Sequence, residues 1–377
     1  MSFNGASCTR SDSIFSFTCK INFCISDISY QPYKINDNTC KLKRLKISLP
    51  PRRRENKFTQ ETRDMLSSMP KKKVRWMLSD HLYQYQNFWY RAEEIQGILR
   101  MQRNFKALDS DLIISTYPKC GTTWLKALSF AIINRHHFNT ATSKEHHPLL
   151  TNNPHLLLPS LDYHYSNDQN PDLKCFSVNN RLLSTHFHLE GLLECIKDSK
   201  CKLIYICRDP KDTVISYWHF MAKLGPKNLE TSSLEEFFEK FCEGVVGNGP
   251  FWDHVLGYWK MSLQFPQKVL FLRYEELKRE PNHHLIKLAQ FLGYPFSAEE
   301  ENEGVVEEIL KLCSFDHLSN LEVNRNGKMA VRKAEIECSA FFRRGEVGDH
   351  VNYITPAMVE RMDKITQEKF LDYGLQL

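Results

Sequence analysis

A short apolar run, followed at once by a polar turn and a second apolar stretch, constrains this chain more than any other feature of its sequence. Residues 111–117, Asp-Leu-Ile-Ile-Ser-Thr-Tyr, are typical of a buried strand, and residues 125–134 have the apolar spacing of a helix. Such a junction points backbone N–H groups, one lysine and two hydroxyls at one place, which suits a phosphate. The sequence therefore predicts an α/β chain with an anion site at this turn.

The turn itself reads Tyr117-Pro-Lys-Cys-Gly-Thr-Thr-Trp124. We expect its proline and glycine to shape the turn, Lys119 to supply a mobile cation, and Thr122 and Thr123 to cap the helix and donate to anionic oxygens. The pattern is related to a Walker loop but lacks its glycine-to-lysine spacing. Taken alone, the octet is also compatible with a solvated lysine and two helix-capping threonines.

A second segment offers another phosphate contact. Residues 202–207 are typical of a buried strand, and they are followed by Arg208 and a helical stretch that contains Ser216. Both side chains could hold one phosphate, and hydrogen bonds from arginine to phosphate are charge-assisted.

A third cationic segment lies near the C-terminus. Arg343 and Arg344 precede Gly345, which allows the backbone to approach a ligand closely. An arginine pair alone is usually a solvated surface feature. Three such segments in one chain favour a phosphate-rich ligand instead.

In their order and separation, the three segments resemble those of the soluble (cytosolic) PAPS-dependent sulfotransferases, from about Phe58 to the C-terminus. PAPS is 3′-phosphoadenylyl sulfate. The resemblance implies contacts to its 5′-phosphosulfate from Lys119, Cys120, Gly121, Thr122, Thr123 and Trp124, and contacts to its 3′-phosphate from Arg208, Ser216, Arg343, Arg344 and Gly345. It also implies nucleotide contacts from Tyr274, Cys313 and Phe315, with Trp124 and Phe315 on the two faces of the adenine. The sequences of residues 152–155, 247–252 and 256–259 resemble those of the plant branch of this family.

The resemblance also indicates a catalytic base. Transfer of a sulfuryl group to a hydroxyl requires the acceptor proton to leave, and an imidazole is suited to take it. Fifteen histidines are present, so composition cannot choose among them. In the family the base ends a Ser-Thr-His or Lys-Thr-His tripeptide, which here is Ser184-Thr185-His186, whereas His188 is expected to be structural. No carboxylate partner of His186 can be named from sequence.

By analogy with phosphoryl transfer, positioning and electrostatic stabilisation should carry most of the catalysis. Lys119 is then the second catalytic residue, because it would neutralise charge on the leaving oxygen. Sulfate carries less charge than a terminal phosphate, so this chemistry does not require Mg²⁺, and no carboxylate pair stands out as a metal site.

Four departures from the family pattern bear on these expectations. Cys120 replaces a serine or threonine of the loop, and Asp209 places a negative charge beside Arg208. His350 replaces a tryptophan, and residues 351–356 differ from the dimerisation pattern of many animal members. We therefore expect a monomer or a weak homodimer.

The remaining pattern predicts one domain, residues 58–377, with a central parallel sheet flanked by helices and a P-loop-like phosphosulfate loop. A further strand is expected at 268–274 and a helix at 284–292, with sites at the carboxyl ends of the strands. The aromatic run 83–90 is compatible with an acceptor pocket or with a core helix, and the lysine-rich cluster 71–75 with a solvated face.

Residues 1–57 differ in composition from the rest. They contain eleven lysines or arginines against four acidic residues, whereas residues 58–377 contain 39 and 41. The domain therefore has no nucleic-acid footprint, and the extension is interpreted as a basic, disordered tail, a transit peptide or a mispredicted gene start. No apolar run is long enough to span a membrane. Four of the twelve cysteines lie in residues 1–57. The other eight favour a reduced, cytoplasmic protein.

The expected reaction is sulfuryl transfer from PAPS to a hydroxylated small molecule, such as a plant phenolic, steroid or hormone-like metabolite. Two alternatives come from other classes. One is a P-loop kinase, which would need Walker spacing and a Mg²⁺ site. The other is a catalytically silent nucleotide-binding protein, to which Cys120 and Asp209 would point.

Deletion of residues 1–50 tests the domain boundary. If these residues lie outside the domain, the deletion removes little buried apolar area, so melting temperature and turnover should stay nearly unchanged. Loss of soluble, active protein would show that the domain begins earlier in the chain than residue 58.

Overall fold

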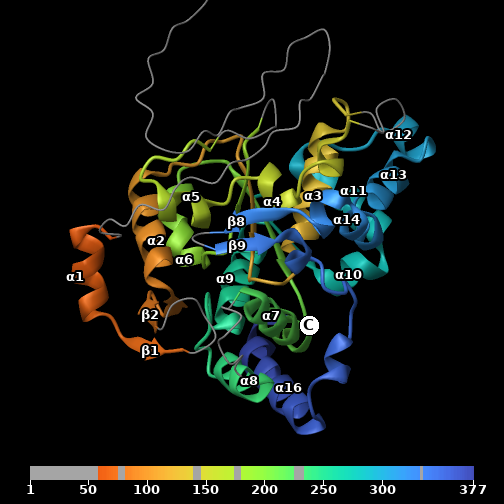
Figure 1. Cartoon of the computed structure of the whole chain (residues 1–377). Helices are drawn as coiled ribbons and strands as arrows, with labels where there is room; N and C mark the ends of the chain where they lie inside the picture. The colour runs from red at the N-terminus through yellow and green to blue at the C-terminus, as the bar shows by residue number, and fades with distance from the viewer. Residues whose placement is uncertain (1–57, 75–80, 139–145, 174–179, 225–232, 332–333) are drawn as a thin grey trace, which may run out of the picture. The chain divides into compact units, whose positions relative to one another are not determined.

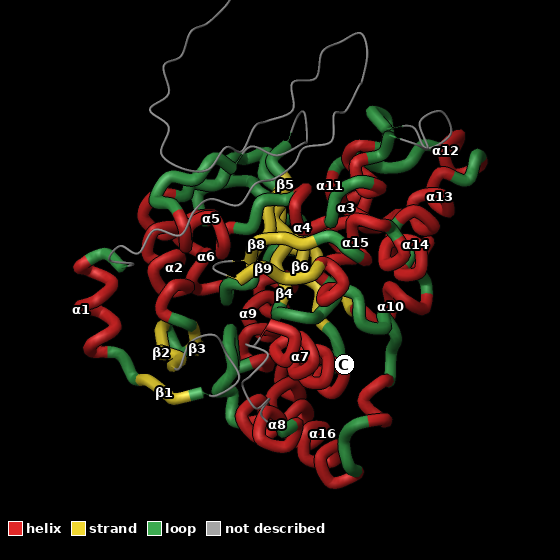
Figure 2. The backbone as a smooth tube through the Cα atoms, in the orientation of Figure 1, coloured by secondary structure: helices red, strands yellow, loops and turns green. Residues whose placement is uncertain are grey.

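The computed structural model describes residues 58–74, 81–138, 146–173, 180–224, 233–331 and 334–377. A central sheet of four parallel strands runs through this part of the chain in the order β5-β4-β6-β7 (Figure 2). The strands are β4 (Leu112–Thr116), β5 (Leu182–Thr185), β6 (Lys202–Cys207) and β7 (Val269–Arg273). The prediction of an α/β fold with a central parallel sheet is confirmed.

Helices cover both faces of the sheet (Figure 1). One face packs against α3 (Thr122–Asn134), α10 (Tyr274–Arg279), α11 (Pro281–Leu292) and α13 (Val305–Leu312). The other packs against α2 (Ala92–Asn104), α6 (Leu189–Ile196), α7 (Pro210–Leu224) and α9 (Phe251–Gln264). The remaining elements are α1 (Gln60–Ser68), β1 (Lys71–Lys73), β2 (His81–Tyr85), β3 (Phe88–Tyr90), η1 (Pro148–Leu150), α4 (Pro154–Leu157), α5 (Leu161–Asn167), α8 (Leu234–Cys242), α12 (Ala298–Asn302), α14 (Phe315–Asn320), α15 (Glu322–Arg325), β8 (Lys328–Val331), β9 (Ala334–Glu337), η2 (Cys338–Phe341), η3 (Asp349–Asn352), α16 (Pro356–Phe370) and η4 (Leu371–Tyr373).

The register of the sheet divides its apolar side chains between two cores. Successive side chains of a strand point to opposite faces, so neighbouring residues enter different cores. Ile113 is level with Leu183 and Leu203, and all three lie in the core beside α6 and α9. Ile114 is level with Ile204 and lies in the core beside α3. Each such burial contributes about 1.5–3 kcal/mol of transfer free energy, which explains why apolar runs specify these strands.

The parallel arrangement brings the ends of all four strands to one edge. The residues that follow the strands are Tyr117, His186, Arg208 and Tyr274, so the predicted site segments leave the sheet side by side. From β4 the chain continues to β5 on one side, whereas from β6 it continues to β7 on the other. Ligands of open α/β sheets bind where the connections diverge in this way.

The aromatic run 83–90 forms a hairpin, so the core-helix alternative is wrong. Strands β2 and β3 pair antiparallel around Gln86 and Asn87, whose φ angles of 49° and 69° are left-handed. Two left-handed residues match the twist of a two-residue hairpin turn and cannot continue a helix. The lysines of β1, by contrast, are exposed, as a solvated face requires.

Residues 1–57 and Arg75 lie outside the described residues, so the predicted N-terminal extension stays a prediction. No helix in the described part of the chain combines the length and apolarity needed to cross a membrane.

Candidate active site

The loop between β4 and α3 places a glycine at the start of the helix. Gly121 has a φ of 104° and is the N-cap residue of α3, with no side-chain capping bond. The expectation that Thr122 and Thr123 cap the helix is wrong, because they already lie inside its first turn. A Cβ on Gly121 would lie 2.8 Å from the Tyr274 ring, so a side chain has no room here. The first amides of α3 are left for an anion.

His186 follows β5 and carries its proton on a defined nitrogen. Its Nδ1 lies 2.8 Å from the backbone oxygen of Thr116, and a carbonyl only accepts, so Nδ1 must donate. Nε2 is then an unprotonated acceptor, and it has no partner among the described residues. Burial lowers the pKa of His186 to about 4, which keeps the imidazole neutral near pH 7. This is the state required of a general base.

A buried carboxylate fixes the backbone at His186. The His186 N–H donates to both oxygens of Asp162, at 2.9 and 3.1 Å. On the other side, the His186 carbonyl accepts from Asn248 Nδ2 at 3.0 Å and from His254 Nε2 at 3.1 Å. Asp162 therefore holds the peptide of His186 and not its ring. This role of Asp162, which lies on α5, could not be predicted because no motif surrounds it in the sequence.

His188 has the contacts of a structural histidine. Its side chain is fully buried, with Nδ1 against the Tyr90 hydroxyl and Nε2 3.0 Å from Gln86 Oε1. Its ring stacks on Phe88 with centroids 4.2 Å apart. Both nitrogens are occupied, so neither is available to a substrate.

Lys119 lies at the tip of the loop with a left-handed backbone, at φ 70°. Its Nζ is 4.1 Å from the centroid of the Phe220 ring. Burial, together with the charges of Arg208 and Arg343, lowers the pKa of this lysine to about 7. The mutual influence of these cations indicates that they gather at one place, and an anion there would relieve their repulsion.

The C-terminal cationic segment docks on the start of α7 through two carboxylates. Asp212 forms an ion pair with Arg208 at 3.1 Å and accepts from the Gly348 amide at 2.8 Å. Asp349 forms ion pairs with Arg343 and Arg344. These carboxylates hold arginines from distant parts of the chain beside one another.

Two guanidinium nitrogens in this cluster have no acceptor. Among the described residues, Arg208 Nε and Arg343 Nε are buried without a hydrogen-bond partner, and Ser216 is a buried residue of α7. An unsatisfied buried donor costs about 1–3 kcal/mol. These donors therefore suit an anionic ligand, while their assignment to the 3′-phosphate of PAPS stays a prediction.

Aromatic rings lie beside the phosphate loop and the C-terminal segment. The Trp124 ring packs edge-on against Tyr274 at 5.7 Å, and the Tyr274 hydroxyl donates to the Gly345 carbonyl at 3.0 Å. A Cβ on Gly345 would lie 2.5 Å from the Phe315 ring. Trp124 and Phe315 are thus linked through these two residues, while their position at an adenine stays a prediction. Cys313 has a fully buried side chain, so only its backbone is available to a nucleotide.

The structure accounts for two of the departures in the sequence. The Cys120 side chain is fully buried, with Sγ 3.6 Å from Thr213 Oγ1, and burial raises the pKa of this thiol to about 12. It faces the core, so its backbone remains available to the loop. The Asp209 carboxylate accepts from the Lys211 amide at 2.7 Å and pairs with the Lys211 ammonium at 3.4 Å. It therefore caps α7 and has its own counter-charge.

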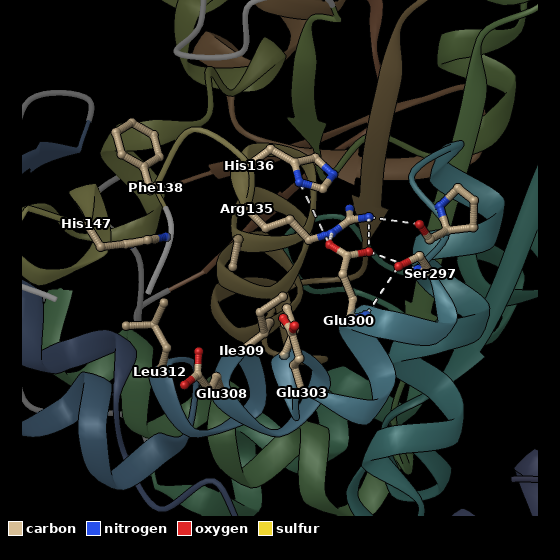
Figure 3. A pocket seen from close by; sticks show the side chains of 13 residues that line it. Arg135, His136, Phe138, His147, Ser297, Glu300, Glu303, Glu308, Ile309 and Leu312 are labelled. Atoms are coloured by element: carbon tan, nitrogen blue, oxygen red, sulfur yellow. Dashed lines mark hydrogen bonds and ion pairs between the residues drawn. The ribbon is translucent and has the colours of Figure 1, made fainter. Parts of the chain in front are cut away.

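A separate cavity of about 530 Å³ lies between the C-terminal end of α3 and the α12–α13 region (Figure 3). None of the predicted site residues lines it. Its central polar pair is Arg135 and Glu300, joined at 2.7 Å, and the same guanidinium also donates to the carbonyls of Ile132, Tyr294 and Pro295. These groups satisfy one another, which indicates a structural role. Among the described residues, no group of three histidine, cysteine or carboxylate side chains could hold a metal ion.

Known proteins provide an independent comparison. The family model described as "Sulfotransferase domain" matches residues 109–374. Cytosolic sulfotransferase 6 of Arabidopsis thaliana is 46% identical over 324 residues, which cover 86% of this chain and 97% of that protein. Cytosolic sulfotransferase 5 of the same plant is 46% identical over 320 residues, with 85% and 97% covered.

Solved structures give the same result. A putative steroid sulphotransferase of Arabidopsis thaliana is 39% identical, with a TM-score of 0.65 over 84% of this chain and 95% of that one. A mouse sulfotransferase in complex with PAP is 25% identical, with a TM-score of 0.57 over 78% and 95%.

Proton uptake tests the cation cluster. At pH 8 Lys119 is mostly neutral in the free protein, since its pKa is about 7. A bound phosphate group favours the ammonium form, so binding of PAP should take up about one proton at pH 8 and much less at pH 6. Calorimetry in two buffers of different ionisation enthalpy measures this uptake. Lys119→Met is the control, and undiminished uptake by this variant would contradict the assignment.

Proposed function

This chain belongs to the cytosolic sulfotransferase family, and on that basis we propose that it moves a sulfuryl group from PAPS to a hydroxyl of a small organic acceptor. The products are a sulfate ester and PAP. One observation carries the assignment to this site: two buried arginine nitrogens without acceptors lie beside a lysine-bearing loop at a helix N-terminus. We propose residues 58–377 as the catalytic domain.

We propose that three groups of side chains hold the nucleotide. Lys119, Thr122, Thr123 and the first amides of α3 take the 5′ end, and the Arg208 and Arg343 side chains take the 3′-phosphate together with Ser216 and Arg344. The Trp124 and Phe315 rings take the adenine. PAPS, when bound, supplies an activated sulfuryl group.

The chemical step uses the two predicted catalytic residues. His186 Nε2 accepts the proton of the acceptor hydroxyl as the acceptor oxygen bonds to sulfur. The bond between sulfur and the 5′-phosphate oxygen breaks, and the Lys119 ammonium stabilises the negative charge left on that oxygen. Asp162 keeps the backbone of His186 in place during this step. The Thr116 carbonyl keeps the imidazole proton of His186 on Nδ1.

We propose a hydroxylated plant metabolite as the acceptor, of the phenolic, steroid or hormone-like class. Cytosolic sulfotransferases 5 and 6, to which the chain is similar, come from Arabidopsis thaliana, and one solved relative is described as a putative steroid sulphotransferase. The first two are named cytosolic, and we propose the same compartment for this chain. A monomer or weak homodimer stays the expected assembly.

Label transfer with a base variant tests the reaction. The protein should move ³⁵S from labelled PAPS to one or more members of a panel of plant phenols and steroids, with or without EDTA. Transfer from labelled ATP would favour the kinase alternative, and PAP binding without any transfer would favour the silent alternative. His186→Ala should keep PAP affinity and lose turnover by about 10²–10⁴-fold, the usual contribution of a general base.

His188→Asn is the comparison for the base. This variant loses contacts to Tyr90 and Gln86, so we expect a lower melting temperature but near-normal turnover per folded molecule. The base would be misassigned if His188→Asn abolished transfer in folded protein while His186→Ala stayed active.

Arg208→Ala tests the 3′-phosphate assignment. The variant loses a charge-assisted hydrogen bond worth about 1.5–3 kcal/mol, so PAP binding should weaken roughly 10–150-fold. An analogue without the 3′-phosphate should lose far less, as measured by calorimetry. Arg279→Ala, which removes a surface arginine, is the control. Equal weakening for the two ligands would exclude Arg208 as a 3′-phosphate ligand.

A further inference from the structure

A buried lysine lies beneath the phosphate loop with one direct partner. Lys126, on the second turn of α3, is 2% exposed, and its Nζ lies 3.4 Å from His155 Nδ1. It forms no ion pair among the described residues, and burial lowers its pKa to about 7, although the charge of the buried Asp162 carboxylate acts in the opposite direction. A buried ammonium with so little compensation costs stability. Packing alone therefore does not account for this residue.

His155 connects this lysine to the phosphate loop. Its Nε2 lies 2.8 Å from Thr123 Oγ1, while its ring packs against Phe341 with centroids 4.2 Å apart and planes tilted by 31°. A single line of contacts therefore runs from Lys126 through both nitrogens of one imidazole to a loop hydroxyl. That hydroxyl has no other partner among the described residues.

The direction of the hydrogen bonds along this line follows from the lysine. Burial lowers the pKa of Lys126 to about 7, so the lysine is an ammonium below that pH. In this form it only donates, so His155 Nδ1 accepts and the ring proton lies on Nε2. Nε2–H then donates to Thr123 Oγ1, which leaves the hydroxyl hydrogen of Thr123 for another acceptor. In the opposite tautomer Nε2 would accept, and the Thr123 hydrogen would be used up inside the protein.

We propose that Lys126 fixes the Nε2–H tautomer of His155 and so directs the Thr123 hydroxyl hydrogen towards the 5′-phosphate of bound PAPS or PAP. Lys126 and His155 are then positioning residues, since neither needs to touch the nucleotide. This inference rests on the proposed function, which places a phosphate at the loop.

Nuclear magnetic resonance tests the tautomer directly in the full-length wild-type protein. Long-range ¹H–¹⁵N spectra of the ¹⁵N-histidine-labelled chain distinguish the two tautomers, and His155→Gln identifies the signal. At pH 6, where Lys126 is mostly charged, we expect Nε2–H in the wild type and a mixture in Lys126→Met. A wild-type protein with Nδ1–H at His155 would overturn the inference, whether or not any variant folds.

Calorimetry with PAP tests the functional consequence. Lys126→Met and Thr123→Val should each weaken PAP binding about tenfold, as expected for one lost hydrogen bond to a charged oxygen. The double variant should be no weaker than either single one, because both changes interrupt the same line. Losses that multiply to about a hundredfold would overturn the inference.

Two controls separate this role from a structural one. Lys126→Met removes a poorly compensated buried charge, so its melting temperature should equal or exceed that of the wild type. Lys202→Met removes a half-buried lysine that donates to the Phe291 carbonyl at 2.6 Å, at the opposite end of β6, and should leave PAP affinity unchanged. Failure of the wild type to bind PAP would contradict the proposed function, whereas normal PAP binding with unaltered affinity in Lys126→Met would overturn only this inference.

Discussion

The pairing of β4 with β5 on one side and β6 on the other is the constraint on which the site depends. Because the three strands are parallel and in fixed register, Lys119, His186 and Arg208 leave the sheet at one edge, although up to 89 residues separate them. Apolar burial on both faces maintains that register, since a slip of one residue would turn every side chain towards the wrong core. The same apolar packing thus stabilises the sheet and fixes the relative positions of Lys119, His186 and Arg208.

Cations converge at this edge at an electrostatic cost, and carboxylates contributed by other elements offset it. Asp212 and Asp349 pair with the arginines, while Asp162 accepts from the backbone N–H of His186, the proposed base. The compensation is incomplete, as the lowered pKa of Lys119 and the unpartnered Nε of Arg208 indicate. A polyanionic ligand completes it, so part of the binding free energy is stored as unrelieved repulsion in the free protein.

Local sequence was sufficient to predict the elements that carry the proposed ligand contacts and insufficient to predict the residues that support them. The strand-turn-helix junctions around Lys119 and Arg208 were predictable because apolar runs and turn residues lie next to one another in the chain. The roles of Asp162, Lys126 and His155 were not predictable, since they depend on contacts between residues that are distant in the sequence. The prediction that Thr122 and Thr123 cap α3 was wrong because Gly121 is the N-cap residue. Its left-handed backbone conformation, which glycine adopts readily and other residues rarely adopt, could not be predicted from the sequence alone.

Cys120 has a consequence for how the loop between β4 and α3 behaves under oxidative conditions. Thiolates, not thiols, react with peroxides and electrophiles, and a cysteine beside a helix N-terminus and several cations would ordinarily be reactive. Here the sulfur faces the core, and burial raises its pKa to about 12, so the loop offers no thiolate. An enzyme built in this way carries a cysteine in this loop without a reactive thiolate there, so alkylating reagents should leave Cys120 unmodified in the folded protein.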